Sequence, residues 1–179
     1  MKILAIDTSS KICGVTILED DQVLINLSND DEKTHSVKLM PMIDEAFKNT
    51  KLPLDNISLL ACCTGPGSFT GVRIGIATIK AFADVKNIPV VGVTSLESLA
   101  YNLFDTLQDS SIVCSLIDAK NNNVYCGIYE KDSKQYNFIS IFTDSIDNTL
   151  EKIRNTISSM KVADISFVGD ASCIYNCLL

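Results

Sequence analysis

Two short stretches in the first half of the sequence carry side chains that could do chemistry. The first is Asp7, Thr8 and Ser9, which follow an apolar run at residues 2–6. This pattern predicts a strand that ends in a polar turn. A carboxylate and two hydroxyls at the tip of a hairpin can hold a hydrated magnesium ion and phosphate oxygens. The same residues are ordinary turn formers, and on this stretch alone the turn interpretation is favoured.

The second stretch is a glycine-rich loop formed by Gly65, Pro66 and Gly67, directly after an apolar run at residues 57–63 that predicts a buried strand. Glycine permits positive φ and proline removes a backbone donor, so the strand must end here. The loop is not a P-loop, because the sequence has no Gly-Lys pair, and it misses the dinucleotide fingerprint by one residue. A nucleotide site, if the chain has one, would combine Gly65 and Gly67 with the first stretch.

The remaining ligand-type residues do not predict a metal site. His35 is the one histidine and precedes a predicted helix, where a loop or capping role is expected. The seven cysteines include no C-x-x-C pair, and Cys62 and Cys63 are neighbours in a predicted strand. Neither a disulfide framework nor a zinc site fits this pattern. We therefore expect reduced, buried thiols in a cytoplasmic protein.

The composition indicates a folded, acidic chain. Of 179 residues 46% are hydrophobic, and 15 basic against 22 acidic residues give a net charge of −7. The length allows one large domain or two small ones. Because nucleic-acid affinity comes largely from lysine and arginine, this surface should repel RNA, and any work on RNA requires a partner. No run of residues approaches the length of a membrane span.

Two predicted helices have unusual apolar faces. The helix at residues 36–49 has one face that consists of Ser36, Leu39, Met40, Ile43 and Phe47. The helix at residues 71–85 begins after a cap at Ser68 or Thr70. One of its stripes can face the sheet, and the other contains Gly71, Gly75, Thr78 and Phe82. Glycine inside a helix costs about 1 kcal/mol, so this stripe predicts close approach of another helix backbone, with burial inside one domain as the alternative.

The predicted elements occur twice in one order, which indicates a duplicated α/β fold. Residues 1–104 contain three strands, a helix, a strand, a helix and a strand, the order of a ribonuclease-H-like domain, followed by one more helix. Residues 105–179 repeat the order up to the strand after the first helix. Asp118 ends a strand as Asp7 does, and Gly169-Asp170 lies where the first half has its glycine-rich loop. The second copy is expected to be incomplete.

Several of these segments together resemble the TsaB family, also called YeaZ. The quoted matches are Ile3–Ser9, His35-Ser36, Leu39–Asp44, Thr64–Gly75, Gly92–Glu97, Ile117–Lys120 and Val124-Tyr125. The resemblance covers nearly the whole chain. It implies two ribonuclease-H-like lobes of the actin, hexokinase and heat-shock-chaperone ATPase type.

The resemblance also implies a role in making threonylcarbamoyladenosine next to the anticodon of tRNA. The transferase of that pathway is the sibling subunit TsaD, which carries a His-x-x-x-His metal pair where this chain has Ser95 and Leu99. Neither side chain binds a metal as imidazole does. We therefore expect a non-catalytic scaffold or activator subunit, with no catalytic residue and no metal of its own.

The partners implied by the resemblance are TsaD, the ATPase TsaE and a second copy of the chain, with tRNA reached only through the complex. The contact is expected on the two apolar faces named above, so Gly75→Leu should abolish binding while the monomer stays folded. ATP or ADP with magnesium could bind at the partner junction. The alternative function is an ATP-binding phosphotransferase or ATPase, for which Asp118 is the candidate base.

Overall fold

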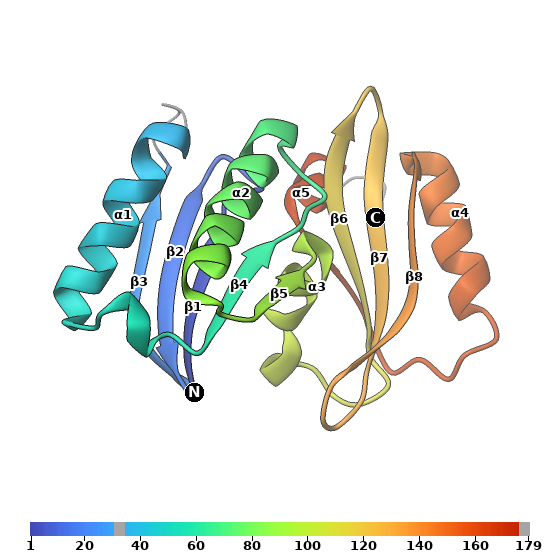
Figure 1. The fold of residues 1–179 in the computed structure, drawn as a ribbon. Coiled ribbons are helices and arrows are strands. Elements are labelled where there is room, and N and C mark those ends of the chain that lie inside the picture. The colour runs from blue at the N-terminus through green and yellow to red at the C-terminus, as the bar shows by residue number, and fades with distance from the viewer. Residues whose placement is uncertain (31–34, 176–179) are drawn as a thin grey trace. The chain divides into compact units, whose positions relative to one another are not determined.

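A computed structural model describes residues 1–30 and 35–175 (Figure 1). The chain divides into two compact units, Met1–Ser95 and Leu96–Leu179. The predicted boundary after residue 104 differs from this division, because helix α3 (Ser95–Tyr101) packs Leu96 and Ala100 into the core of the second unit. Among the described residues, no helix is long and apolar enough to cross a membrane.

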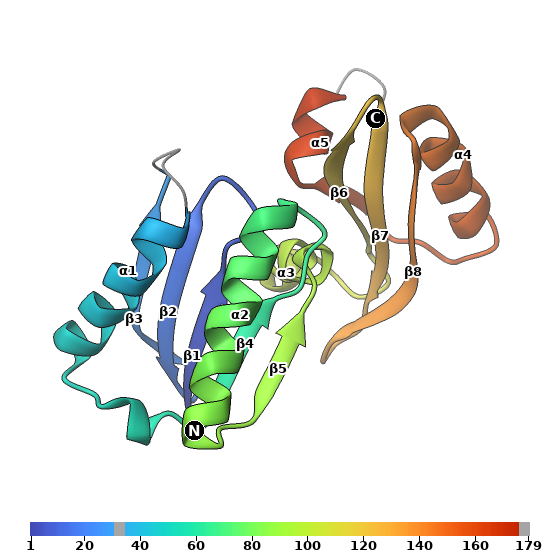
Figure 2. The ribbon, with the colours of Figure 1, turned by 45° about the horizontal axis from the view of Figure 1, so that its top comes forward.

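The first unit is a mixed five-stranded sheet with the order β3-β2-β1-β4-β5. Its strands are β1 (Lys2–Asp7), β2 (Cys13–Glu19), β3 (Gln22–Asn29), β4 (Leu59–Cys63) and β5 (Val90–Val93). The first three form an antiparallel meander, and β1, β4 and β5 run parallel. Helices α1 (His35–Thr50) and α2 (Phe69–Lys86) lie side by side on one face of this sheet, as both views show (Figures 1 and 2).

The core of the first unit lies between the sheet and these two helices. Alternate strand residues point into it, such as Leu4 and Ile6 of β1, because side chains along a strand alternate between the two faces. Helix α1 contributes Leu39 and Ile43, which are 1% and 2% exposed. A short 3-10 helix, Leu54–Asn56, leads into β4.

Strand β5 is an edge strand of the first sheet. Among the described strands it pairs only with β4. All four of its residues are exposed, and three of them are valines, Val90, Val91 and Val93.

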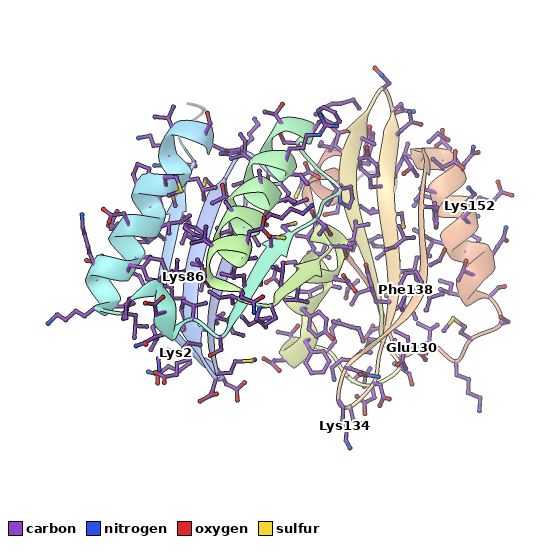
Figure 3. All side chains as sticks on the ribbon, viewed as in Figure 1. Lys2, Lys86, Glu130, Lys134, Phe138 and Lys152 are labelled. Atoms are coloured by element: carbon purple, nitrogen blue, oxygen red, sulfur yellow. The ribbon has the colours of Figure 1, made fainter. Side chains whose placement is uncertain are left out.

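The second unit is a four-stranded sheet with the order β8-β7-β6-β9. Its strands are β6 (Ile112–Lys120), β7 (Asn123–Lys131), β8 (Tyr136–Ser145) and β9 (Ile165–Val168). Helices α4 (Ile146–Ile157) and α5 (Asp170–Ile174) share one core with the sheet, and α3, followed by the 3-10 helix Phe104–Thr106, belongs to another. Figure 3 shows Phe138 on β8, Lys134 at the β7–β8 turn and Lys152 on α4. The nitrogen of Lys152 lies 2.6 Å from the carboxylate of Asp144, just before α4.

Candidate functional site

The structure brings the two predicted stretches together at the carboxyl end of β1. The backbone N–H of Ser68 donates to the carbonyl oxygen of Ser9 at 2.6 Å. A Cβ atom on Gly67 would lie 2.2 Å from the same oxygen, so only glycine fits there. Gly65 has φ of +87°, which glycine adopts at little cost. The glycine-rich loop is therefore packed directly on the Asp7–Ser9 turn.

The side chains of the turn are largely occupied by the fold itself. Thr8 is 2% exposed, and its hydroxyl donates to the carbonyl of Gly71 at 2.7 Å. The carboxylate of Asp7 accepts from the backbone N–H of Ser9 at 2.8 Å, which is an ordinary Asx turn. The nitrogen Nε2 of His35 lies 2.8 Å from the carbonyl oxygen of Ser10 and ties the start of α1 to the same turn.

The glycines of α2 serve this contact inside the first unit. A Cβ on Gly71 would lie 2.0 Å from the carbonyl oxygen of Thr8, and one on Gly75 would lie 2.5 Å from the Thr8 hydroxyl oxygen. Both glycines are buried. The backbone of α2 thus comes close to Thr8, directly after β1 of the same unit. The sequence-based expectation that Gly71 and Gly75 approach a helix of another protein is wrong. The alternative, burial inside one domain, is confirmed.

The other predicted interface residues divide between core and surface. Leu39 and Ile43 are buried, and Phe47 and Phe82 pack against the same core, so these four are directed inward. The hydroxyl of Thr78 donates to the carbonyl of Ile74 within α2 at 2.9 Å. Ser36 and Met40 are exposed. Ser36 and Met40 are thus on the surface of the first unit, and the other four side chains support the helices from beneath.

A different set of residues forms the exposed surface of the two helices, which we call the outer helix face. It contains Ser36, Val37, Met40, Phe69, Arg73, Ala77, Lys80, Ala81, Asp84 and Val85, all of them exposed. Val37, Phe69 and Val85 are large apolar side chains with 64%, 70% and 77% of their surface exposed. Phe69 and Val85 lie near the two ends of α2, and large apolar side chains mark an interaction site where they form a contiguous patch. Sequence periodicity missed Phe69 because it precedes the predicted helix start.

Ser95 is built into the fold at the position where the resemblance places the first metal ligand of TsaD. It is 6% exposed, and its hydroxyl donates to the carbonyl of Pro66 at 2.7 Å. Its oxygen also lies 3.1 Å from the sulfur of Cys63, and its N–H donates to the carbonyl of Gly65. Within residues 1–30 and 35–175, no three His, Cys, Asp or Glu side chains are placed to hold a metal. Ser95 therefore fixes the glycine-rich loop.

The second unit repeats the arrangement of the first in its backbone. The carboxylate of Asp118 accepts from the N–H of Lys120, as Asp7 accepts from Ser9. The glycine contacts differ, because a Cβ on Gly169 would lie 2.1 Å from the carbonyl oxygen of Leu116, two residues before Asp118, whereas Gly67 lies against Ser9, two residues after Asp7. Strands β6 and β9 pair in parallel as β1 and β4 do.

Asp118, the candidate base of the enzyme alternative, is held as an ion. The side-chain ammonium of Lys120, and then its backbone N–H, lower the pKa of Asp118 by hydrogen bonding to the carboxylate. A general base works best when its pKa lies near the operating pH. A carboxylate with a lowered pKa is a weak base, so the local chemistry of Asp118 favours a structural role.

The cysteines provide a direct test of the described cores. Cys13, Cys62, Cys63, Cys114 and Cys126 are free and buried, as predicted, whereas Cys173 is exposed; Cys177 lies outside the described residues. Burial raises the pKa of Cys114, and it raises that of Cys126 to about 12.

Because the thiolate is the reactive form, iodoacetamide at pH 8 should label Cys173 well before the five buried thiols. Peptide mass spectrometry of the native protein measures this order, and equal labelling of Cys114 and Cys173 would contradict it.

The two sheets and their helices define the class of the protein. It is an α/β protein built from two ribonuclease-H-like lobes. An exopolyphosphatase from Cytophaga hutchinsonii shares the fold over 93% of this chain and 66% of its own, at a TM-score of 0.52 and 11% identity. YeaZ from Pseudomonas aeruginosa matches at a TM-score of 0.72 and 28% identity, over 79% of this chain and 66% of its own.

Sequence comparison gives the particular family. The family described as TsaD, tRNA N6-adenosine threonylcarbamoyltransferase, matches residues 24–178. The TsaB protein of Buchnera aphidicola (Schizaphis graminum) is 32% identical over 89% of this chain and 72% of its own length. That of Bacillus subtilis is 37% identical over 73% of this chain and 56% of its own length. The chain belongs to the TsaB (YeaZ) family. It spans 56% and 59% of the B. subtilis and Haemophilus influenzae relatives that it matches.

Proposed function

We propose that this chain takes part in tRNA threonylcarbamoyladenosine biosynthesis as a non-catalytic subunit that binds TsaD. The relatives that it matches carry the name of that pathway. The observation that supports the binding role most is the outer helix face, which exposes Val37, Met40 and Phe69 on two adjacent helices. In the complex TsaE would be a further partner, and tRNA would be reached through TsaD.

The residues near Ser95 support the non-catalytic part of the proposal. The hydroxyl of Ser95 is used to hold the glycine-rich loop. Leu99, four residues on, is half-buried in α3 and offers no ligand atom. A chain with these two side chains supplies a folded surface to a catalytic partner and not the metal chemistry itself. Any metal that acts in the complex would be held by TsaD.

The alternative, an ATP-binding phosphotransferase or ATPase, has less support from the site. Of its proposed ligands, Thr8 is buried and bonded to Gly71, and Asp118 is paired with Lys120. Nucleotide with magnesium at a junction with the partner stays compatible with the exposed loop residue Gly67. An assay of ATP binding and hydrolysis by the isolated chain with magnesium separates the two functions. Hydrolysis by this chain alone would favour the enzyme, and binding without hydrolysis would exclude it.

A binding experiment tests the proposed function at the outer helix face. Met40→Asp places a charge where an apolar side chain is 50% exposed, and we expect TsaD from the same organism to bind at least about tenfold more weakly. Light scattering after size exclusion gives the mass of the mixture, and a titration gives the dissociation constant.

The control is Phe138→Asp, a matched exposed apolar residue on β8, 60% exposed. It should bind TsaD as the unmodified chain does. Unchanged binding by Met40→Asp would show that α1 lies outside the interface. A chain that ignores TsaD altogether, while it remains folded, would remove the proposed function.

A further inference from the structure

The second unit exposes aromatic side chains that rest on buried tyrosines. Tyr101, at the end of α3, is 51% exposed, and Phe138 on β8 (Figure 3) is 60% exposed. The ring of Tyr101 lies 5.2 Å from that of Tyr136 at an interplanar angle of 81°, and the ring of Phe138 lies 6.2 Å from that of Tyr129. These contacts hold the two exposed rings in place, and an ordered surface loses less entropy when it binds a partner.

Along β8, Ile141 continues the surface that Phe138 begins. In the β7–β8 register, Phe138 pairs with Tyr129 and Ile141 pairs with Gly127. The two partners are two residues apart on β7, so both β8 side chains leave the same face of the sheet. Ile141 is 46% exposed. We call this surface the aromatic strip, and its members are Tyr101, Phe104, Phe138 and Ile141.

A lysine of the second unit shows how one end of the strip holds a cation. Lys131 is 9% exposed, and its ammonium nitrogen lies 4.8 Å from the centroid of the Phe104 ring. The same nitrogen lies 3.3 Å from the carboxylate of Asp109. A nearly buried ammonium group needs such compensation for the water that it has lost. An aromatic ring and a carboxylate thus bind a cation together at this place.

Acidic side chains outnumber basic ones around the strip. Four carboxylates and two ammonium groups come from α3, from the segment that follows it and from the end of the β7–β8 hairpin. The surface therefore attracts a basic partner, and it repels nucleic acid even though its rings can stack on bases. The carboxylates are those of Glu97, Asp105, Asp109 and Asp132, and the ammonium groups are those of Lys131 and Lys134.

A buried hydroxyl beside the strip lacks a hydrogen-bond partner. Tyr136 is 8% exposed, and within residues 1–30 and 35–175 its hydroxyl makes no hydrogen bond. Burial raises the pKa of Tyr136, and the neighbouring Tyr101 adds to this effect, so the hydroxyl stays a neutral donor. Buried polar groups without a partner are uncommon in native proteins. The carbonyl oxygen of a segment bound beside Tyr101 would supply the acceptor.

We propose that the aromatic strip is a docking site for a basic segment of another protein, in which an arginine lies beside large apolar side chains. The guanidinium packs on Tyr101 and Phe104 and donates to Asp105, because arginine stacks on aromatic rings and binds carboxylates at the same time. The apolar side chains cover Phe138 and Ile141.

The occupant is a different protein and not a second copy, because the rim of the strip is acidic and the chain as a whole has a net charge of −7. The inference goes beyond the proposed function. The strip belongs to the second unit, whereas the outer helix face belongs to the first.

Peptide binding tests the strip directly. The probe is a fluorescein-labelled peptide, Arg-Leu-Arg-Leu-Arg, titrated with the full chain at about 0.15 M salt and followed by fluorescence anisotropy. We expect a dissociation constant of about 100 μM or tighter. The peptide Arg-Ser-Arg-Ser-Arg has the same charge without apolar side chains and should bind at least about threefold more weakly. Glu-Leu-Glu-Leu-Glu should not bind, because like charges repel.

Substitutions that keep the net charge separate the strip from general attraction to an acidic protein. Phe138→Ser and Tyr101→Ser should each weaken binding of Arg-Leu-Arg-Leu-Arg at least about fivefold. Val23→Ser, at a side chain of β3 that is 53% exposed, is the matched control and should leave binding unchanged. Asp105→Asn should weaken binding at least about twofold. Asp21→Asn, the same change of charge at an exposed turn of the first unit, should have little effect.

Three results would overturn the inference. They are a peptide that does not bind, equal binding by Phe138→Ser and Val23→Ser, and self-association of the chain that Phe138→Ser abolishes, which would make a second copy the occupant. Circular dichroism checks the fold of each variant. Phe138→Ser carries the test if Tyr101→Ser, which removes a contact with Tyr136, does not fold.

The proposed function is tested separately from the strip. Met40→Asp should lose TsaD and keep the peptide, whereas Phe138→Asp should lose the peptide and keep TsaD. Loss of TsaD by Phe138→Asp would assign the strip to the TsaD contact and would overturn a separate partner. A chain that binds the peptide but not TsaD would remove the proposed function and leave the docking site standing.

Discussion

Gly71→Ala is expected to lower the free energy of unfolding of the first unit by about 3 kcal/mol or more. Overpacking a well-packed site costs about 1–3 kcal/mol and occasionally more. Here the added Cβ would lie 2.0 Å from the carbonyl oxygen of Thr8, a backbone atom that moves only if β1 or α2 moves. Replacing a glycine inside a helix by alanine would by itself stabilise the helix. A large loss of unfolding free energy would therefore report the close contact between α2 and Thr8.

The measurement is urea unfolding of the full chain by circular dichroism, with hydrogen exchange of β1 and α2 amides to assign the loss to the first unit. Ala77→Gly, at an exposed site of the same helix, should cost only about 1 kcal/mol. A chain with Gly71→Ala that is as stable as the original would mean that α2 does not approach β1 as described.

Gly75 offers a contrast within the same contact. Its added Cβ would meet the hydroxyl oxygen of the Thr8 side chain at 2.5 Å, not the backbone. Thr8→Ala should therefore reduce the loss of unfolding free energy caused by Gly75→Ala by at least about 1 kcal/mol. It should leave the loss caused by Gly71→Ala unchanged. Because of this contact, the larger change Gly75→Leu is expected to disrupt the first unit, in place of the folded monomer that the sequence alone led us to expect.

The second large effect is expected from Gly169→Ala, between β9 and α5 of the second unit. Gly169 has φ of +113°, and an added Cβ would lie 2.1 Å from the carbonyl oxygen of Leu116. Backbone strain and the clash together should lower the stability of the second unit by about 3 kcal/mol. Hydrogen exchange of β6 and β9 amides measures the loss, with β1 as the internal reference.

Gly14→Ala is the matched control for Gly169→Ala. Its Cβ would make an ordinary contact of 3.8 Å with the carbonyl oxygen of Asp7. We expect its stability to stay close to that of the unmodified chain. If Gly169→Ala were equally harmless, the turn at the start of α5 would have to differ from the one described.

Strands and helices were predictable from the sequence because each is marked by local chemistry. Alternation and apolar runs placed the strands, and β9 is found at the predicted residues 165–168. Ser68 was one of two candidate caps for α2, and its side chain accepts from the N–H of Gly71. The start of α2 was placed two residues late, because Phe69 and Thr70 carry no helix signal of their own.

The orientation of the helices was harder to predict, since a glycine stripe fits a strand of the same unit as well as a helix of another protein. Gly71 and Gly75 are buried against Thr8, a contact between residues more than sixty positions apart that no local pattern encodes. The boundary predicted after residue 104 differs from the division after Ser95 for a similar reason. Helix α3 follows β5 directly in the chain, but Leu96 and Ala100 pack with Val113 and Tyr129 of the second unit.

Strand β5 presents an exposed sheet edge, since among the described strands it pairs only with β4. Edge strands with unpaired backbone groups and exposed valines add further strands readily. A contact around a two-fold axis is closed and stops at two copies, whereas head-to-tail contact at a strand edge can continue into larger species. A mass that grows steadily with concentration would therefore report strand addition, and a charged substitution at the exposed Val91 should stop that growth.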